Sequence, residues 1–133
     1  MSDEFPPLIG KYKVLGIIAK GGMGVVYKAI HPSLKRYVVI KKMSSRGKSA
    51  NAERFKKEAQ ILLDLQSPYI VHLFDYFTEG GYRYMVEELV DGMACDALLK
   101  KQGSLPPQIC MLIMQDACYG LKYAHSKKVI HPD

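Results

Sequence analysis

The sequence predicts an α+β fold, in which a five-stranded antiparallel sheet carries one helix and is followed by further helices. Three observations lead to this prediction. β-Branched and apolar runs bounded by turn residues fill most of the first 90 residues, as is typical of strands. One stretch with helical spacing separates the third run from the fourth, and the last third of the chain is helical in pattern. The expected order is therefore β-β-β-α-β-β-α-α.

The first three strands are expected at residues 12–19, 25–31 and 36–43. Their sequences, YKVLGIIA, VVYKAIH and RYVVIKKM, are rich in the β-branched and apolar residues that strands favour. The glycine-rich residues 21–24 fall between the first two strands, so we expect them to form the turn that joins these strands. Residues 44–50 are polar and are expected to form a loop.

A helix is predicted over residues 51–65, with Asn51 as its N-cap and Glu53 in its first turn. Four residues recur at helical spacing and should share one face of this helix: Phe55, Glu58, Leu62 and Leu65. Two further strands are expected at residues 70–77 and 82–90, joined by a hairpin turn at residues 78–81.

Two helices are expected in the last third of the chain. The first is short and covers residues 96–101. The second begins at Pro107, because proline suits the first position of a helix, and continues to about Ser126. Asp116 and Gly120 interrupt the apolar stripe of this second helix.

The amino-acid composition favours some classes of protein and excludes others. The 133 residues are 48% hydrophobic and 24% charged, which is typical of a globular domain. Three cysteines without CxxC spacing indicate a reducing, cytoplasmic compartment. No apolar run reaches the roughly 20 residues of a membrane span, so no membrane association is expected. The net charge is +6, but no basic stripe with interleaved aromatic residues follows a helix, so nucleic acid is not an expected partner.

The glycine turn is the first candidate for a functional site. Gly21, Gly22 and Gly24 carry no Cβ, so their backbone N–H groups can approach phosphate oxygens closely. A tight hairpin without a ligand has the same composition, and the turn alone does not distinguish the two cases.

A lysine and a glutamate strengthen the phosphate interpretation. Lys41 follows Val38-Val39-Ile40 in an apolar strand, and a buried ammonium group is costly unless it is paired. Glu58, on the predicted apolar face of the next helix, is the candidate partner. A Lys–Glu pair beside a phosphate-binding turn is an arrangement used in phosphoryl transfer.

The chain resembles the protein kinase family, of the serine/threonine type with a bacterial-like glycine loop. The resemblance rests on five segments in order: IAKGGMGVVYKA, VVIKKM, RFKKEAQILLDLQSPYIV, YMVEELVDG and YAHSKKVIHPD. It implies an N-terminal tail at residues 1–10 and an ATP-binding small lobe at residues 11–90. Residues 91–133 are then the exit from the hinge and the start of an incomplete large lobe.

The resemblance also implies roles for single residues. Lys41 would hold phosphate oxygens, Glu58 would orient Lys41, and Asp133 would accept the proton of the substrate hydroxyl. The backbone C=O of Glu88 and the N–H of Val90 would meet the adenine edge. ATP, a protein substrate and, for the family, Mg²⁺ are the implied ligands. The implied nucleotide-binding positions are Ala19, Gly21, Gly22, Gly24, Val26, Val39, Lys41, Glu87, Glu88 and Val90.

Several positions depart from the kinase pattern. Ala19 replaces the first loop glycine, and Val39 replaces the alanine that packs near adenine. Glu87 stands at the position before the hinge, where an apolar residue is usual. Its carboxylate needs a cation, and Lys41 is the nearest candidate, so that Glu87 would compete with Glu58 and with phosphates. Pro132 replaces the arginine of the catalytic loop.

Nothing after Asp133 supplies the family's metal ligands or activation segment, so we expect residues 1–133 to be inactive alone. The last helix would lack its usual covering, which favours association through that helix. Two alternatives remain open. One is a non-catalytic, pseudokinase-like binding module, and the other is the product of a truncated gene.

Overall fold

The structure is a computed structural model that describes residues 4–22, 24–43 and 49–130. The chain divides into two compact units. The sheet unit comprises Met1–Asp64 and His72–Leu89, and the helical unit comprises Leu65–Val71 and Val90–Asp133. Each unit has its own internal packing and is described separately.

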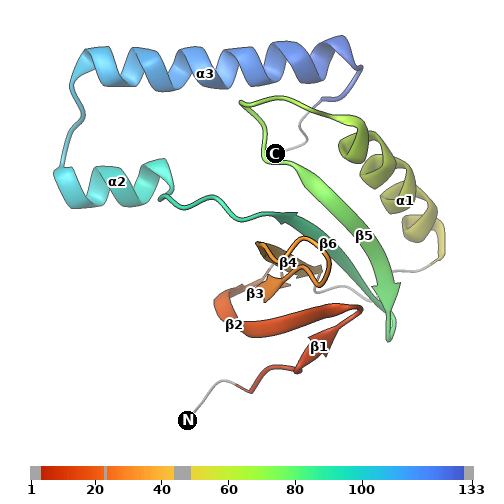
Figure 1. The fold of residues 1–133 in the computed structure, drawn as a ribbon. Helices are drawn as coiled ribbons and strands as arrows, with labels where there is room; N and C mark the ends of the chain where they lie inside the picture. The colour runs from red at the N-terminus through yellow and green to blue at the C-terminus, as the bar shows by residue number, and fades with distance from the viewer. Residues whose placement is uncertain (1–3, 23, 44–48, 131–133) are drawn as a thin grey trace. The chain divides into compact units, whose positions relative to one another are not determined.

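An antiparallel sheet forms the sheet unit, with the strand order β1-β2-β3-β4-β6-β5 (Figure 1). The predicted α+β fold is confirmed, and each of the five predicted strands is present with shifted ends. The elements of this unit are β1 (Leu8–Ile9), β2 (Tyr12–Gly21), β3 (Gly24–Ile30), β4 (Tyr37–Met43), α1 (Ser49–Asp64), β5 (Leu73–Glu79) and β6 (Tyr82–Glu88).

The additional strand β1 lies in the segment that the sequence predicted to be a tail. Its two residues pair with β2, with Leu8 opposite Lys13 and Ile9 opposite Tyr12. Ile9 is almost fully buried in the core. A strand of two residues has no detectable alternation, so only its pairing with β2 identifies it.

The core of the sheet unit follows the alternation of side chains along the strands. In β4, Val38 and Ile40 are fully buried, whereas Lys41 is exposed, because successive side chains point to opposite faces. β2 and β3 contribute to the core in the same way. The core cluster consists of Ile9, Tyr12, Val14, Tyr27, Ala29, Val38, Ile40, Tyr84 and Val86.

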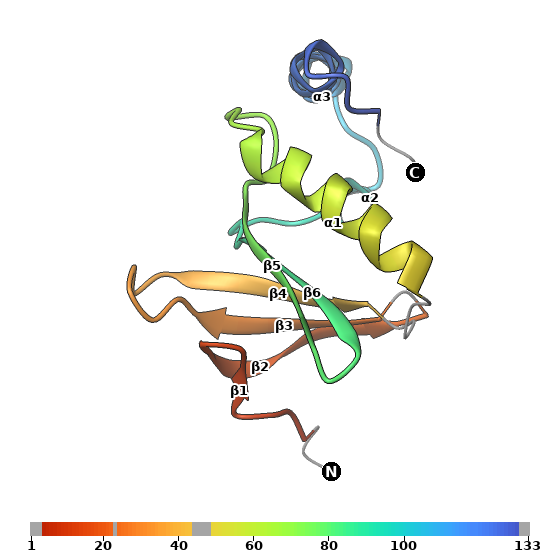
Figure 2. The same cartoon turned by 90° about the vertical axis from the view of Figure 1, so that its right-hand side faces the viewer.

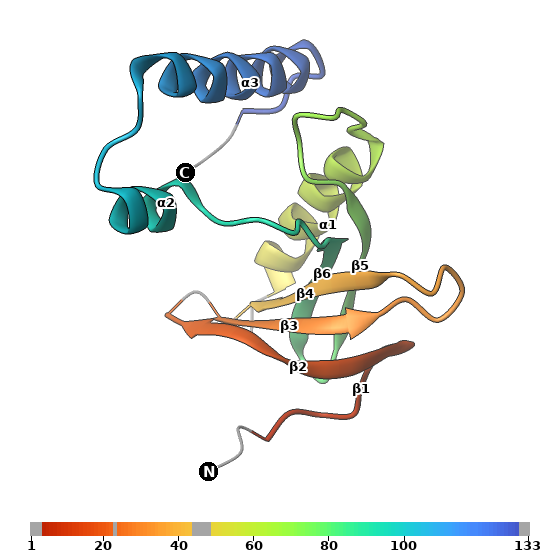
Figure 3. The same ribbon diagram turned by 60° about the vertical axis from the view of Figure 1, so that its left-hand side comes forward.

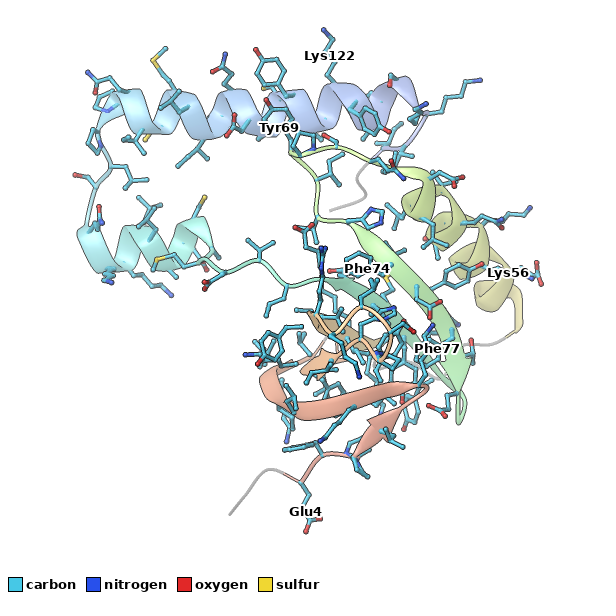
Figure 4. All side chains as sticks on the ribbon, viewed as in Figure 1. Glu4, Lys56, Tyr69, Phe74, Phe77 and Lys122 are labelled. Atoms are coloured by element: carbon cyan, nitrogen blue, oxygen red, sulfur yellow. The ribbon has the colours of Figure 1, made fainter. Side chains whose placement is uncertain are left out.

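Tyr12 joins the core to an aromatic stack on β5 and β6. Its ring stacks on Phe77, at 6.3 Å between centroids, and Phe77 stacks on Tyr84 at 5.2 Å (Figure 4 labels Phe77). The buried Tyr12 hydroxyl donates a hydrogen bond to Asp75 Oδ2 at 3.0 Å. Burial, reinforced by this bond, raises the pKa of Tyr12. Tyr12 is therefore a neutral donor at physiological pH.

The β5–β6 hairpin turns at Gly80 and Gly81, with φ values of 59° and 83°. Two successive residues with positive φ suit glycine in a two-residue hairpin turn. β5 runs to Glu79, so the turn is shorter than the predicted one. β5 also begins at Leu73 rather than at residue 70, and β6 ends at Glu88 rather than at residue 90.

Helix α1 begins at Ser49, two residues before the predicted start, so Asn51 lies inside the helix and is not its N-cap. The helix packs along β5 (Figure 2). Ala59 is fully buried, whereas its neighbour Glu58 is exposed. The small Ala59 makes the close approach to the sheet, and the placement of Glu58 on an apolar face stays a prediction. Residues 49 and 50 of the predicted loop at 44–50 belong to α1, and residues 44–48 lie outside the described residues.

The helical unit contains α2 (Cys95–Gln102) and α3 (Pro107–Ser126), as predicted to within one residue. Pro107 occupies the first turn of α3, where its missing N–H leaves no bond unmade. Within the described part of the chain, no helix is both long and apolar enough to cross a lipid bilayer.

Residues 65–71 lie against α3 within the helical unit. Gln66 N–H donates to the Tyr123 hydroxyl at 3.1 Å, and Tyr69 packs on Tyr119 at 5.2 Å between ring centroids (Figure 4 labels Tyr69). A Cβ on Gly120 would lie only 3.1 Å from the carbonyl oxygen of Tyr69. The glycine that interrupts the apolar stripe of α3 thus allows the backbone of this loop to approach the helix.

Candidate functional site

The glycine turn joins β2 to β3, as predicted. Gly21 ends β2, Gly24 begins β3, and the two are register partners. Gly24 has a φ of 137°, which favours glycine. A Cβ on Gly21 or on Gly22 would have no neighbour within 4 Å. Packing therefore does not explain these two glycines, and no side chain lies where a Cβ of either would stand.

An open hollow of about 400 Å³ adjoins this turn. β2, β3 and β4, which supply most of its lining, lie side by side in the sheet (Figure 3). Its lining combines the glycine turn with three lysines and, among the described residues, no carboxylate. The described lining residues are Ala19, Lys20, Gly21, Gly22, Gly24, Val25, Val26, Lys41, Lys42 and Met43. Open backbone and positive charge together suit an anionic ligand such as a phosphate.

Lys41 reaches this hollow from the middle of the sheet. It is paired with Val26 on β3 and with Met85 on β6. Its side chain is 46% exposed. The prediction that Lys41 is buried is wrong, because the alternation of β4 places it on the face opposite Val38 and Ile40.

The ammonium group of Lys41 forms an ion pair with Glu87, at 3.1 Å between Nζ and Oε2. Glu87 is paired with Val39, two residues from Lys41, so the two charged residues are diagonal neighbours on adjacent strands. Lys41 is thus the cation of Glu87, as the sequence analysis considered it could be. Glu58 is exposed on α1, and its pairing with Lys41 stays a prediction.

Val26, Val39 and Ala19 also lie on the face of the sheet that carries Lys41, or at the edge of that face. Val26 is half-buried and lines the hollow, and Val39 is half-buried between Lys28 and Glu87. Ala19 pairs with Val26 and has no positive φ. The alanine that replaces the first loop glycine is therefore accommodated without backbone strain.

Glu88 and Val90, the two residues expected to meet the adenine edge, belong to different units. Glu88 closes the β6 end of the sheet unit, where its N–H donates to the His72 carbonyl at 2.9 Å. The N–H of His72 donates to Glu88 Oε2 at 3.2 Å. Val90 belongs to the helical unit, and its carbonyl accepts a bond from the N–H of Gly92.

The predicted catalytic aspartate, Asp133, lies outside the described residues. Over residues 4–22, 24–43 and 49–130, no group of three His, Cys, Asp or Glu side chains is arranged to hold a metal ion.

Two lysines of the hollow were missed by the sequence analysis. Lys20 and Lys42 are the register partners of Val25 on its two sides. Lys42 also lies over the Tyr82 ring, with Nζ 3.9 Å from the ring centroid. Only the strand register brings Lys20 and Lys42 to one place, so spacing along the chain gave no signal.

Comparison with known proteins identifies the family. The model of the protein kinase domain matches residues 12–133. The chain belongs to the protein kinase family. Its similar relatives are bacterial serine/threonine kinases, and the chain corresponds to a part of them.

A probable serine/threonine-protein kinase of Clostridium perfringens, CPE1738, is 33% identical over 92% of the chain and 18% of the relative. PrkC of Bacillus subtilis is 33% identical over 93% of the chain and 19% of the relative. The chain therefore spans about a fifth of the length of these relatives.

Solved kinase structures share the fold. The kinase domain of Mycobacterium tuberculosis PknI superimposes with a TM-score of 0.84 at 24% identity. That match covers 95% of this chain and 52% of the solved chain. Rad53 residues 1–466, solved in complex with AMP-PNP, gives a TM-score of 0.81 at 24% identity, over 92% of this chain and 32% of the solved chain.

Proposed function

We propose that this chain is the ATP-binding portion of a serine/threonine protein kinase, with residues 11–90 as the nucleotide-binding lobe. The observation that carries the proposal is the hollow in which the open glycine turn and Lys41 meet. Together with the rest of a kinase domain, this portion would serve transfer of the ATP γ-phosphate to a protein hydroxyl.

Different residues of the site would contact different parts of the nucleotide. The N–H groups of the glycine turn can donate to phosphate oxygens, because no Cβ stands in front of Gly21 or Gly22. Lys41 supplies a cation beside that turn. Val26 and Val39 offer apolar surface on the same face of the sheet, on which a base can pack. Glu58 would orient Lys41 when α1 and β4 approach.

Residues 1–133 by themselves should bind nucleotide and not catalyse transfer. Catalysis requires metal ions on the phosphates, and among the described residues no group of three His, Cys, Asp or Glu side chains is arranged to hold one. Asp133, proposed as the acceptor of the substrate proton, acts on a substrate held largely by other parts of a kinase domain.

Calorimetric titration with ATP tests the proposed function. Lys41→Met should weaken ATP binding about 10-fold or more, since it removes a charge-assisted contact to phosphate. The matched control is Lys13→Met, which removes an exposed lysine of β2 outside the hollow and should leave ATP affinity unchanged. Equal affinities of the wild type and Lys41→Met would overturn the role given to Lys41.

A non-catalytic binding module is the second candidate, and the Lys41–Glu87 ion pair favours it. In that case, nucleotide binding without Mg²⁺ is the whole activity. Thermal unfolding with ATP, with and without Mg²⁺, separates the two candidates. A stabilisation that depends on Mg²⁺ argues for a metal-using kinase, whereas one that is independent of Mg²⁺ argues for the binding module.

A further inference from the structure

We propose that Glu87 is a built-in competitor for the phosphate-binding lysine, so that a phosphate group must displace the Glu87 carboxylate before Lys41 can hold it. The inference rests on the proposed nucleotide site and concerns how strongly that site binds phosphate. It makes Glu87 a residue that sets the preference between phosphorylated and unphosphorylated ligands.

The strand register builds the pair into the sheet. Lys41 is opposite Met85, and Glu87 is opposite Val39, so the two charges lie diagonally across the β4–β6 pairing. Both strands lie inside the six-stranded sheet, with neighbours on each side. The 3.1 Å contact is therefore formed without any rearrangement of the backbone.

Breaking this ion pair is more unfavourable for Glu87 than for Lys41, because the Glu87 side chain is the less exposed of the two. The Glu87 side chain is 20% exposed, whereas that of Lys41 is 46% exposed. A half-buried carboxylate has less access to water than an exposed one, so the departure of its cation is less well compensated by solvent. Lys41 can exchange the carboxylate for another anion, but Glu87 depends on Lys41.

The same lysine also lines the hollow. Lys41 lines the hollow beside the glycine turn, and Glu87 is not among the lining residues. A phosphate in the hollow and the Glu87 carboxylate would therefore compete for the same ammonium group. Lys20 and Lys42 also line the hollow, so a phosphate retains some positive charge while Lys41 stays with Glu87.

Titrations with ATP and with adenosine distinguish competition for Lys41 from a general change in nucleoside affinity. ATP carries the phosphates that compete for Lys41, and adenosine carries none. Removal of the Glu87 charge should strengthen ATP binding, because Lys41 is then available without loss of an ion pair. The affinity for adenosine should not change, since adenosine has no phosphate group to contact Lys41.

The experiment is calorimetric titration of the full chain with ATP and with adenosine. Four proteins are compared: the wild type, Glu87→Gln, Lys41→Met and the double variant. Glu87→Gln should bind ATP about 5–10-fold more tightly than the wild type and should bind adenosine equally well. In the Lys41→Met background, Glu87→Gln should have no effect on ATP affinity.

A matched control removes the general effect of net charge. Glu53→Gln makes the same change in net charge at an exposed position of α1 and should leave both affinities unchanged. Thermal unfolding of each variant verifies that it is folded. If Glu87→Gln fails to fold, Glu87→Met replaces it, because Met has a similar volume and no polar group left unpaired.

Each outcome decides the proposal. Unchanged ATP affinity in Glu87→Gln, a gain that also appears with adenosine, or a gain that persists without Lys41 would overturn it and leave the proposed function standing. Absence of ATP and adenosine binding in every variant would instead overturn the proposed function, and this inference with it. ATP binding by Glu87→Gln alone would be the strongest support.

Discussion

The sheet unit and the helical unit differ in how completely they bury their apolar residues. The sheet unit encloses a contiguous core from five of its strands, β1 to β4 and β6. In the described part of the helical unit, the buried residues are Leu65, Gly120 and Ala124. On α3, Met111 is 71% exposed and Met114 is 62% exposed.

This difference separates folding from association. The sheet unit has a core of its own, and the hollow of the proposed site is lined by its residues alone. The helical unit leaves apolar surface on α3 that favours contact with other protein surfaces. We therefore expect mutations in the sheet unit to change the stability of the site and mutations on α3 to leave the site intact.

The largest expected effect is a core truncation in the sheet unit. Ile40→Ala should lower the free energy of unfolding by about 2–5 kcal/mol, because it leaves a cavity among fully buried residues. Urea denaturation measures this loss. Ile18→Ala, at a position of β2 that is 51% exposed, is the control and should cost less than about 1 kcal/mol. Equal losses would contradict the placement of the core.

An intermediate effect is expected in the helical unit. Gly120→Val should destabilise the packing of residues 65–71 on α3 by about 1–3 kcal/mol, since its Cβ would crowd the Tyr69 carbonyl. Hydrogen exchange should increase in α3 and not in β2–β4. Ala117→Val, at an exposed position of the same helix, is the control. Faster exchange in both variants alike would show that helix propensity, not the contact, is responsible.

A smaller effect is expected for the hydrogen bond of the buried Tyr12. Tyr12→Phe removes the hydrogen bond to Asp75 and keeps the ring stacked on Phe77. The loss in free energy of unfolding should be about 0.5–1.5 kcal/mol, measured by urea denaturation. Tyr37→Phe removes an exposed hydroxyl and should be nearly neutral. A neutral Tyr12→Phe would mean that solvent replaces the bond to Asp75.

The parts of the fold that the sequence predicted are those with local signals. Patterns of only a few residues identify the glycine turn, the strands that flank it and the proline that begins α3. The two-residue β1 lacks such a pattern, and its strand character comes only from pairing with β2.

The sequence predicted the chemistry of the site better than the exposure and grouping of its side chains. Lys41 was taken as buried from its apolar neighbours, but alternation on β4 exposes it. Its pairing with Glu87 was considered from chemistry, and the β4–β6 register makes it possible. The contributions of Lys20 and Lys42 likewise follow from register across three strands.

Hydrogen–deuterium exchange of the full chain, with and without ATP, tests most directly the claim that the sheet unit holds the phosphate site. Protection is expected in peptides that cover residues 17–26 and β4, where backbone donors and Lys41 line the hollow. Peptides from α3 should exchange at the same rate in both conditions. Saturating ATP that leaves residues 17–26 unprotected, or that protects α3 instead, would contradict the account.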